Sequence, residues 1–521
     1  MLGLFVLMAN IVGFLCGFIF LDLSPQQNTD RSIRVITRQS VSPATRLGEK
    51  HRPESDHSPI TTTSPPRSSL NRPAASQTVL SEIMTTSLAL PWAQHSSTRG
   101  PRRTGLRPPF APCLYKKGRD SEDGIWQDFS VDDTLRFYAY SAFVDDRPTI
   151  GSDPVVRIIA LATKLENDDL SGVGKTLYCV FHHETMNSEK QAPVMVQVAS
   201  AAGPIGFGVE MDAGVKLKEY IFTCPLGHWQ NPIPFAVTIL GRPDRLSAVT
   251  SCIPIEVPPK PPMRKDFAVC VQVSYGQLDP HRLIEWFELQ RLLGVSRVGV
   301  YDLSIDPGPG LEVLRHYARE GLVELRKTDS LPVPGGSQYL LHGSPVINDC
   351  LYRNMHSFNW ILVIDLDEVL VPRNYSTLVE LAAHLNRTYY PSPANFLFLN
   401  QYFFLDSDPD FQESTDYTIL RYRHKAPLSP NGYAMKGYVD PHGCVQMHNH
   451  YCMGVAEAFK TRNHYEFVDS SLATSHHYKT CHLSPAECQK MLTQTTLDDV
   501  MMTYKSALKT SVENKIREVF R

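Results

Sequence analysis

Apolar and polar positions follow two different patterns along this chain, and the pattern changes near residue 259. Between residues 113 and 258, short runs of β-branched and aromatic residues are separated by clusters of Gly, Pro, Asp and Asn, as in antiparallel β domains. The runs that predict strands are 135–143, 155–163, 176–181, 193–198, 220–224 and 235–240. The proline-rich stretch 257–262 then predicts a stiff linker and a domain boundary.

Beyond Lys265, apolar runs alternate with stretches of helical periodicity. The predicted strands are 267–274, 296–301, 322–325 and 360–364, and the predicted helices are 280–293, 311–319 and 344–358. Repeated strand–helix–strand units favour a mainly parallel sheet that is covered on both faces. We therefore expect an α/β domain of the nucleotide-binding type over residues 259–521, preceded by a β-rich accessory domain over residues 113–258.

The first 23 residues predict an uncleaved signal-anchor. Residues 2–21 carry no charge, and as a helix they would be about 30 Å long, enough to cross a bilayer. A cleaved signal peptide would have a basic start and a shorter apolar stretch. Residues 24–112 are rich in Ser, Thr, Pro and Arg without apolar periodicity, so we expect a disordered stem.

Features of the sequence disagree about the side of the membrane on which the C-terminal part lies. Arg31, Arg34 and Arg38 follow the apolar segment and no basic residue precedes it, which disfavours a lumenal C-terminal side. Against this, ten of the 11 cysteines follow the segment without paired CxxC spacing, which favours disulfides in a secretory compartment, with buried free thiols as the alternative. Asn374 and Asn386 begin N-glycosylation sequons, which matter only on a lumenal surface.

Overall charge excludes one class of partner. The 521 residues have a formal net charge of -3 and a pI near 6.7. Nucleic-acid-binding domains usually show a strongly basic balance, which this chain lacks. The sequence therefore gives no electrostatic basis for nucleic-acid binding.

An acidic cluster follows the most apolar predicted strand, because Trp360–Ile364 leads directly into Asp365, Leu366, Asp367 and Glu368. Ligands of open α/β sheets bind at the carboxyl ends of the strands. Because side chains alternate along a strand, Asp365 and Asp367 can point the same way while Leu366 turns into the core. Two carboxylates suit Mn²⁺ or Mg²⁺, and such an ion neutralises a departing nucleoside diphosphate. The alternative is that these acidic residues merely mark the end of a strand.

The same residues also fit the DxDxV opening of haloacid-dehalogenase-type phosphatases, with Asp365 as nucleophile and Asp367 as acid/base. That class opens its α/β domain with this strand, whereas here about 100 residues of βα pattern come first. The pair Asp498-Asp499, which would have to supply the later acidic motif, lies in a helix-like stretch. The phosphatase is therefore the weaker alternative.

Several motifs lie between about Lys265 and Lys479, namely Glu285-Trp286, Leu293-Gly294-Val295, Tyr301-Asp302-x-Ser304, Asn348-Asp349-Cys350, Asp365-Leu366-Asp367-Glu368, Lys436-Gly437-Tyr438-Val439-Asp440-Pro441 and His476-His477-Tyr478-Lys479. Together these motifs resemble glycosyltransferase family 92. The resemblance implies a GT-A-like fold, Mn²⁺, and inverting transfer from a UDP-sugar, UDP-galactose, to a hydroxyl of a glycan on a glycoprotein or glycolipid. With the anchor and the stem, it predicts a single-pass type II Golgi membrane protein whose catalytic domain is lumenal.

Two positions depart from the family pattern. Leu303 stands where an Asn is expected after Tyr-Asp, and Val369 stands where an aromatic residue commonly follows Asp-Leu-Asp-Glu. The first departure weakens the expected donor contacts, whereas the second fits core packing. They motivate an alternative from a different class, a non-catalytic lumenal glycan-binding or scaffold protein with the same fold.

The resemblance also implies roles for individual residues. Asp365 and Asp367 are expected to bind metal and nucleotide, with Tyr301 and Asp302 near the base or the ribose. Lys436 is the candidate to counter the charge of the diphosphate, the alternative being a solvated surface lysine.

Two further roles have several candidates. A neutral imidazole suits Mn²⁺ as an additional ligand, and His477 or His448 is the candidate, the alternative being a hydrogen-bonded structural histidine. Inversion in one displacement needs a base to accept the proton of the acceptor hydroxyl. The sequence leaves Asp440, Glu457 and Glu413 as candidates for this base, against ordinary surface acids.

Overall fold

The computed structural model describes residues 123–124, 126–130, 136–163, 177–183, 194–198, 200–210, 216–227, 232–241, 251–328, 331, 338–406 and 417–521. All of these residues lie in one compact unit. The expected signal-anchor (1–23), the expected stem (24–112) and the candidate base Glu413 lie outside the described residues. Within these ranges, no helix is long and apolar enough to cross a membrane.

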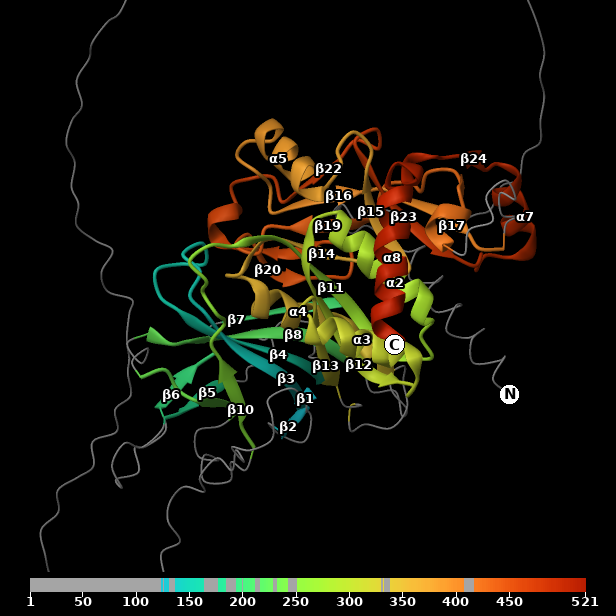
Figure 1. The fold of residues 1–521 in the computed structure, drawn as a ribbon. Helices are drawn as coiled ribbons and strands as arrows, with labels where there is room; N and C mark the ends of the chain where they lie inside the picture. The colour runs from blue at the N-terminus through green and yellow to red at the C-terminus, as the bar shows by residue number, and fades with distance from the viewer. Residues whose placement is uncertain are drawn as a thin grey trace, which may run out of the picture. The chain divides into compact units, whose positions relative to one another are not determined.

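The N-terminal part is a β sheet, as its sequence predicts (Figure 1). The strand order is β6-β5-β9-β10-β3-β4-β8-β7, with β2 paired to β3. Phe137, Phe181 and Phe222 lie in a fully buried core on one side of these strands. The strands are β2 (Gln127–Ser130), β3 (Arg136–Asp145), β4 (Val155–Thr163), β5 (Tyr178–His182), β6 (Val194–Gln197), β7 (Ser200–Glu210), β8 (Lys216–Pro225), β9 (Ala236–Leu240) and β10 (Ile253–Glu256).

The C-terminal part is built on an eight-stranded sheet of order β1-β13-β12-β11-β14-β19-β16-β22. Strands β11 to β14 are mutually parallel, and their order β13-β12-β11-β14 places a topological switch point between β11 and β14, where ligands of such sheets bind. The strands are β1 (Asp123–Gly124), β11 (Lys265–Gly276), β12 (Val295–Ile305), β13 (Val323–Thr328), β14 (Phe358–Val363), β16 (Asn395–Phe398), β19 (Lys436–Val439) and β22 (Tyr465–Phe467).

Three helices connect the parallel strands, and capping residues mark both ends of the first of them. In α2 (Pro280–Leu292) the Asp279 side chain accepts hydrogen bonds from the first backbone N–H groups, and Gly294 follows the helix at φ 94°. The next helix is α3 (Pro309–Arg319). The third, α4 (Gln338–Asn354), begins before the predicted residue 344, since Pro345 lies inside the helix instead of near its start.

The two sheets share a hydrophobic core through α4. Tyr138 and Tyr140 of β3 belong to the same buried cluster as Ile347 and Leu351 of α4. Helices α2 and α3 contribute to a different cluster on the other face of the eight-stranded sheet, so both faces are covered as predicted. The N-terminal sheet therefore packs against the helix layer next to the candidate site.

Two smaller sheets complete the C-terminal part. A five-stranded sheet has the order β15-β23-β17-β18-β24, and a two-stranded hairpin joins β20 to β21. The remaining helices include α5, which carries the second sequon, and the C-terminal α8. The bounds are β15 (Glu368–Pro372), β17 (Asn400–Phe404), β18 (His424–Lys425), β20 (Cys444–Met447), β21 (Cys452–Val455), β23 (Ala473–Lys479), β24 (Thr496–Leu497), α5 (Leu378–Thr388), α6 (Thr418–Arg421), α7 (Pro485–Thr493) and α8 (Lys505–Val519).

All cysteines in the described ranges are oxidised, as expected. The four pairs seen there are Cys179–Cys224, Cys270–Cys350, Cys444–Cys452 and Cys481–Cys488. Cys252 is also disulfide-bonded, and its partner lies outside those ranges. The alternative of buried free thiols is therefore wrong for these residues.

Candidate active site

The acidic cluster lies at the carboxyl end of β14, beside the switch point of the sheet. The strand ends at Val363, and residues 365–368 form a turn in which the Glu368 N–H donates to the Asp365 carbonyl at 3.1 Å. The expected extended alternation is therefore wrong for Asp365 and Asp367. Both side chains still reach solvent, with 37% and 39% of their surface exposed.

Glu368 holds this turn together from the inside. Its carboxylate accepts a hydrogen bond from the Asp365 backbone N–H at 3.0 Å and is only 2% exposed. Its backbone carbonyl accepts a hydrogen bond from the Trp286 indole at 2.8 Å, which ties the turn to α2. Burial raises the pKa of Glu368, while Lys436 and His477 act in the opposite direction.

Lys436 is a buried cation of the site and not a solvated surface lysine. It begins β19, which pairs antiparallel with β14, and its Nζ lies 2.9 Å from Glu368 and 3.1 Å from Asp365. Burial lowers the pKa of Lys436, but Asp365 and Glu368 raise it by more than burial lowers it. The pKa of Lys436 therefore lies above its usual value. The side chain therefore keeps its positive charge beside the exposed carboxylates.

His477 reaches the same turn from β23, which pairs antiparallel with β15. Its Nε2 lies 3.2 Å from Asp367 and its Nδ1 lies 3.2 Å from Glu368. Burial raises the pKa of Asp367, but the hydrogen bond and charge of His477 outweigh it and leave the pKa below its usual value. His477 therefore orients Asp367 and favours its ionised form.

The types of ligand at this turn fit a divalent cation. Mg²⁺ and similar hard ions bind through one or two carboxylates and take their remaining ligands from water and phosphate oxygens. Asp365 and Asp367 supply two partly exposed carboxylates of this kind. In the described part of the chain, three potential metal ligands converge only at His316, Glu320 and Glu518, a cluster that also includes the cation Lys515.

His448, the other histidine considered as a ligand, lies near Lys436 and not against the carboxylates. Burial, followed by the charge of Lys436, lowers the pKa of His448 to about 4, so its imidazole is neutral near pH 7. Its neighbour His450 contacts the Met435 carbonyl through Nδ1 at 2.7 Å. Both histidines therefore border the site on the side of β19.

Tyr301 and Asp302 lie in the second half of β12 and have different environments. The Tyr301 ring is 1% exposed, and its hydroxyl donates to Asp349 at 2.6 Å. This arrangement makes Tyr301 a core residue that presents no surface to a nucleotide. Asp302 is half-buried and accepts a hydrogen bond from the Ile305 backbone N–H at 2.7 Å.

The two described candidates for the general base, Asp440 and Glu457, have different surroundings. Asp440 follows β19 at the end opposite Lys436, where it lines a cavity of about 440 Å³ together with Arg264 and Asn359. Glu457 is 70% exposed and pairs with Lys460. Within the described residues, Asp440 accepts from the His442 backbone N–H and Glu457 pairs with Lys460, so neither is seen to contact Asp365 or Asp367, and both assignments stay predictions.

The remaining predicted positions are at the surface or in the core. Asn374 is exposed, and the half-buried Asn386 lies in α5, where its side chain accepts a hydrogen bond from Ser392 at 2.8 Å. Val369 is completely buried, as its interpretation as a core residue requires, and Leu303 is 9% exposed.

Sequence reasoning did not assign a role to Glu368, which proves to be the central contact of the turn. The available signal was its position next to Asp367 in the motif, combined with its place at the start of a strand. The sequence also offered no reason to place Tyr402 at the site. In the structure, the centroid of its ring lies 5.2 Å from that of the His477 ring. Tyr402 is on β17, which pairs with β23 through long-range contacts that no local pattern reveals.

Comparison with known proteins finds a family match for the C-terminal half of the chain. The model of glycosyltransferase family 92 matches residues 265–520. No curated protein matches the chain. Among solved structures, the crystal structure of S. aureus TarS is 12% identical, covering 48% of this chain and 43% of that chain with a TM-score of 0.23.

A ferredoxin-NADP⁺ reductase from Plasmodium falciparum with 2'P-AMP is 6% identical and covers 42% of this chain and 80% of that chain, with a TM-score of 0.10. At such TM-scores neither likeness carries an argument about this protein.

Proposed function

Residues 265–520 belong to glycosyltransferase family 92, and from this premise we propose that the protein is a divalent-cation-dependent, inverting galactosyltransferase that uses UDP-galactose. The observation that carries the proposal is the acidic turn at the switch point of the sheet. Asp365 and Asp367 are partly exposed there, and Lys436 and His477 lie within hydrogen-bond range of the same turn.

In this proposal, Asp365 and Asp367 would hold Mn²⁺ or Mg²⁺, and the ion would supply positive charge to balance that of the departing UDP. The residues of the chain prepare this site. His477 fixes the orientation of Asp367, Glu368 closes the turn, and Trp286 attaches the turn to α2. These contacts reduce the reorganisation that donor binding would otherwise require.

We extend the proposal to the cellular setting. The oxidised cysteines and the exposed Asn374 support a secretory compartment, with a glycan of a glycoprotein or glycolipid as the acceptor. A Golgi location with an N-terminal membrane anchor fits the apolar segment 2–21. Protection of the C-terminal part from protease in intact vesicles would test this orientation directly.

The decisive experiment compares Asp367→Ala with the wild-type protein and with Asp499→Ala. Asp499 is an exposed aspartate that pairs with Arg423 away from the acidic turn. With UDP-galactose, Mn²⁺ and galactose-ended glycans, Asp367→Ala should lose at least about a hundredfold in transfer rate while its melting temperature stays close to that of the wild type. Asp499→Ala should retain full activity.

One observation favours a second candidate, a non-catalytic glycan-binding or scaffold protein. Lys436 already pairs with Asp365, which reduces the negative charge available to a cation. Calorimetric titration of UDP with and without Mn²⁺ separates the candidates, because only the transferase requires metal-dependent nucleotide binding. Absence of such binding, or full activity of Asp367→Ala, would reject the metal assignment.

The phosphatase alternative does not fit. The acidic turn follows β14, the fourth parallel strand of the domain, instead of the first. Asp498, the candidate for the later acidic motif, pairs with Arg373 at 2.7 Å and Lys425 at 2.8 Å and is not available to a metal.

A further inference from the structure

A cavity of about 440 Å³ lies at the amino ends of β11 and β14, whereas the acidic turn follows the carboxyl end of β14. Its volume is within the range of about 300–1,000 Å³ that is usual for small-ligand sites. Phe267 of β11 pairs in register with Trp360 of β14, and both side chains line the cavity. They form an apolar wall of a site that is separate from the one proposed for the donor.

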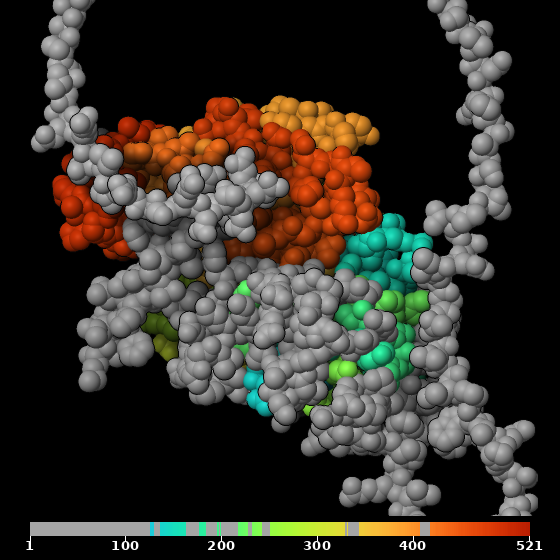
Figure 2. Space-filling view, turned by 180° about the vertical axis from the view of Figure 1, so that it is seen from behind, coloured from blue at the N-terminus to red at the C-terminus, as the bar shows by residue number. Residues whose placement is uncertain are grey.

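One face of α5 forms another wall of this cavity. The helix residues that line it have the spacing of a single helix face, and they are Val379, Ala382, Ala383 and Asn386. Figure 2 shows α5, in light orange, at the upper edge of the molecule. Ala383 is exposed, so the cavity is open to solvent on the side of the helix. The small alanine side chains leave room between the helix and the strands.

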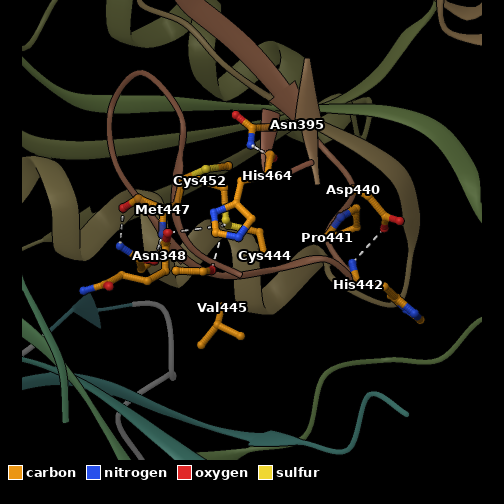
Figure 3. The surroundings of a disulfide bond; sticks show 12 residues. Asn348, Asn395, Asp440, Pro441, His442, Cys444, Val445, Met447, Cys452 and His464 are labelled. Atoms are coloured by element: carbon orange, nitrogen blue, oxygen red, sulfur yellow. Dashed lines mark hydrogen bonds between the residues drawn. A yellow bond between two sulfur atoms is a disulfide. The ribbon is translucent and has the colours of Figure 1, made fainter. Parts of the chain in front are cut away.

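Polar groups surround the apolar walls. Asn359 Nδ2 donates to Asp266 Oδ1 at 3.3 Å, and both residues line the cavity. Arg264 contacts the His442 ring through Nη2 at 3.1 Å, and Asp440 accepts a hydrogen bond from the His442 backbone N–H at 2.8 Å (Figure 3). Asp266 is exposed, and Arg264, Asn359 and Asp440 are half-buried. Their polar atoms can therefore meet a ligand that enters from solvent.

Asn386 provides a point of covalent attachment at the cavity. It begins the sequon Asn386-Arg387-Thr388, whose other two residues are exposed. The Ser392 hydroxyl donates to Asn386 Oδ1 at 2.8 Å, and Ser392 also lines the cavity. This bond occupies the amide oxygen, so Nδ2, the atom to which an N-glycan is attached, remains available. A glycan at Asn386 therefore starts at the wall of the cavity.

We propose that Asn386 carries an N-glycan whose first N-acetylglucosamine residues fold back into this cavity. A pyranose ring packs its apolar C–H face on an aromatic ring such as that of Trp360. Its hydroxyl and acetamido groups can hydrogen-bond to Asn359, Asp266 and Arg264. The glycan then joins the end of α5 to the starts of β11 and β14. The inference rests on the secretory compartment of the proposed function and assigns no step of sugar transfer to this cavity.

The test measures the occupancy and the accessibility of the glycan in the full-length protein produced in cultured animal cells. Glycopeptide mass spectrometry follows its release from Asn386 by peptide N-glycosidase F, first from the native protein and then from the denatured chain. Docking of the innermost sugars should slow native release about tenfold, which corresponds to a docking free energy of about 1.4 kcal/mol. Thr388→Ala should abolish the modification, whereas Thr388→Ser, which keeps the sequon, should retain it.

The variant Ala383→Phe tests the cavity itself, because a phenylalanine there fills the space between α5 and the strands without changing the sequon. The matched control is Ala507→Phe, since Ala507 is also an exposed alanine within a helix, α8. Ala383→Phe should bring native release at Asn386 to within about threefold of release from the denatured chain. Ala507→Phe should leave the slow native release unchanged. Neither variant should alter Mn²⁺-dependent UDP binding, because the cavity and the acidic turn lie at opposite ends of β14.

The outcomes distinguish this inference from the proposed function. An unmodified Asn386, or equal release from the native and denatured protein, would overturn the inference. Slow native release that Ala383→Phe does not accelerate would also overturn it, since the glycan would then be protected outside the cavity. If Asn374 is unmodified as well, the secretory compartment fails together with the inference. A docked glycan on a protein that transfers no galactose would leave the inference intact and reject the transferase alone.

Discussion

Arg147 joins the N-terminal sheet to the hairpin beside the candidate site, and its removal should destabilise the protein strongly. Its side chain is fully buried, and its Nε and Nη2 each lie 2.7 Å from a carboxylate oxygen of Asp145. Its Nη1 donates to the Cys444 carbonyl at 2.6 Å and also to the Pro441 carbonyl. Asp145 is therefore only one of three groups that depend on this guanidinium.

The magnitude follows from the groups that Arg147→Met leaves behind. Asp145 keeps Arg157, at 3.1 Å, as its one charged partner among the described residues, together with the backbone N–H of residue 147, and two buried carbonyls lose the guanidinium as a donor. Removing one member of a buried ion pair costs about 3–5 kcal/mol. The exposed pair of Lys260 and Asp146 provides the control, and Lys260→Met should cost no more than about 1 kcal/mol.

Urea unfolding followed by intrinsic fluorescence measures the free-energy difference, and hydrogen exchange of residues 441–445 reports the local effect. We expect faster exchange there in Arg147→Met than in Lys260→Met. Arg147→Lys should be intermediate, because a single ammonium group cannot reach the carboxylate and both carbonyls in the same geometry. An Arg147→Met variant within about 1 kcal/mol of the wild type would refute the reasoning.

Two further predictions concern the core of the C-terminal part. The disulfide Cys270–Cys350 spans 80 residues, so Cys270→Ala/Cys350→Ala should lower the free energy of unfolding by about 4–5 kcal/mol, and a change below about 1 kcal/mol would contradict this. Burial raises the pKa of Glu285 to about 7, despite hydrogen bonds from the Thr418 and Ile419 backbones. Because the folded protein then binds this proton more tightly than the unfolded chain, stability should fall as pH rises from about 4.5 to 7, and Glu285→Gln should flatten that slope in urea titrations at several pH values.

The central parallel strands β11 and β14 were predictable because each contains a continuous apolar run, residues 267–271 in β11 and 360–363 in β14. The predicted strand 360–364 corresponds to β14 (Phe358–Val363), and the predicted 267–274 lies within β11. Strand β7 was missed because Ser, Ala, Gly and Pro interrupt its apolar pattern. The strands after residue 395 were also missed, because all of them except the seven-residue β23 are only two to five residues long and carry too little periodicity.

The site was predictable only where its residues are adjacent in sequence. Asp365 and Asp367 stand out because they follow an apolar strand, whereas Lys436 and His477 reach them through the pairings β14·β19 and β15·β23. Local patterns do not contain these long-range pairings. Asp440 shows the consequence, because it lies four positions after Lys436 but at the opposite end of β19.

Glu368 resolves an apparent conflict in the charge of the candidate site. Lys436 pairs with Asp365, which by itself would weaken the attraction of the turn for a cation. The same lysine also pairs with Glu368, so three formal negative charges, from Asp365, Asp367 and Glu368, face the positive charge of Lys436, and 3 − 1 leaves two when the His477 imidazole between Asp367 and Glu368 is neutral. A dication balances that excess. The buried Glu368 therefore lets Lys436 stay within reach of a diphosphate without cancelling the charge that a metal site needs.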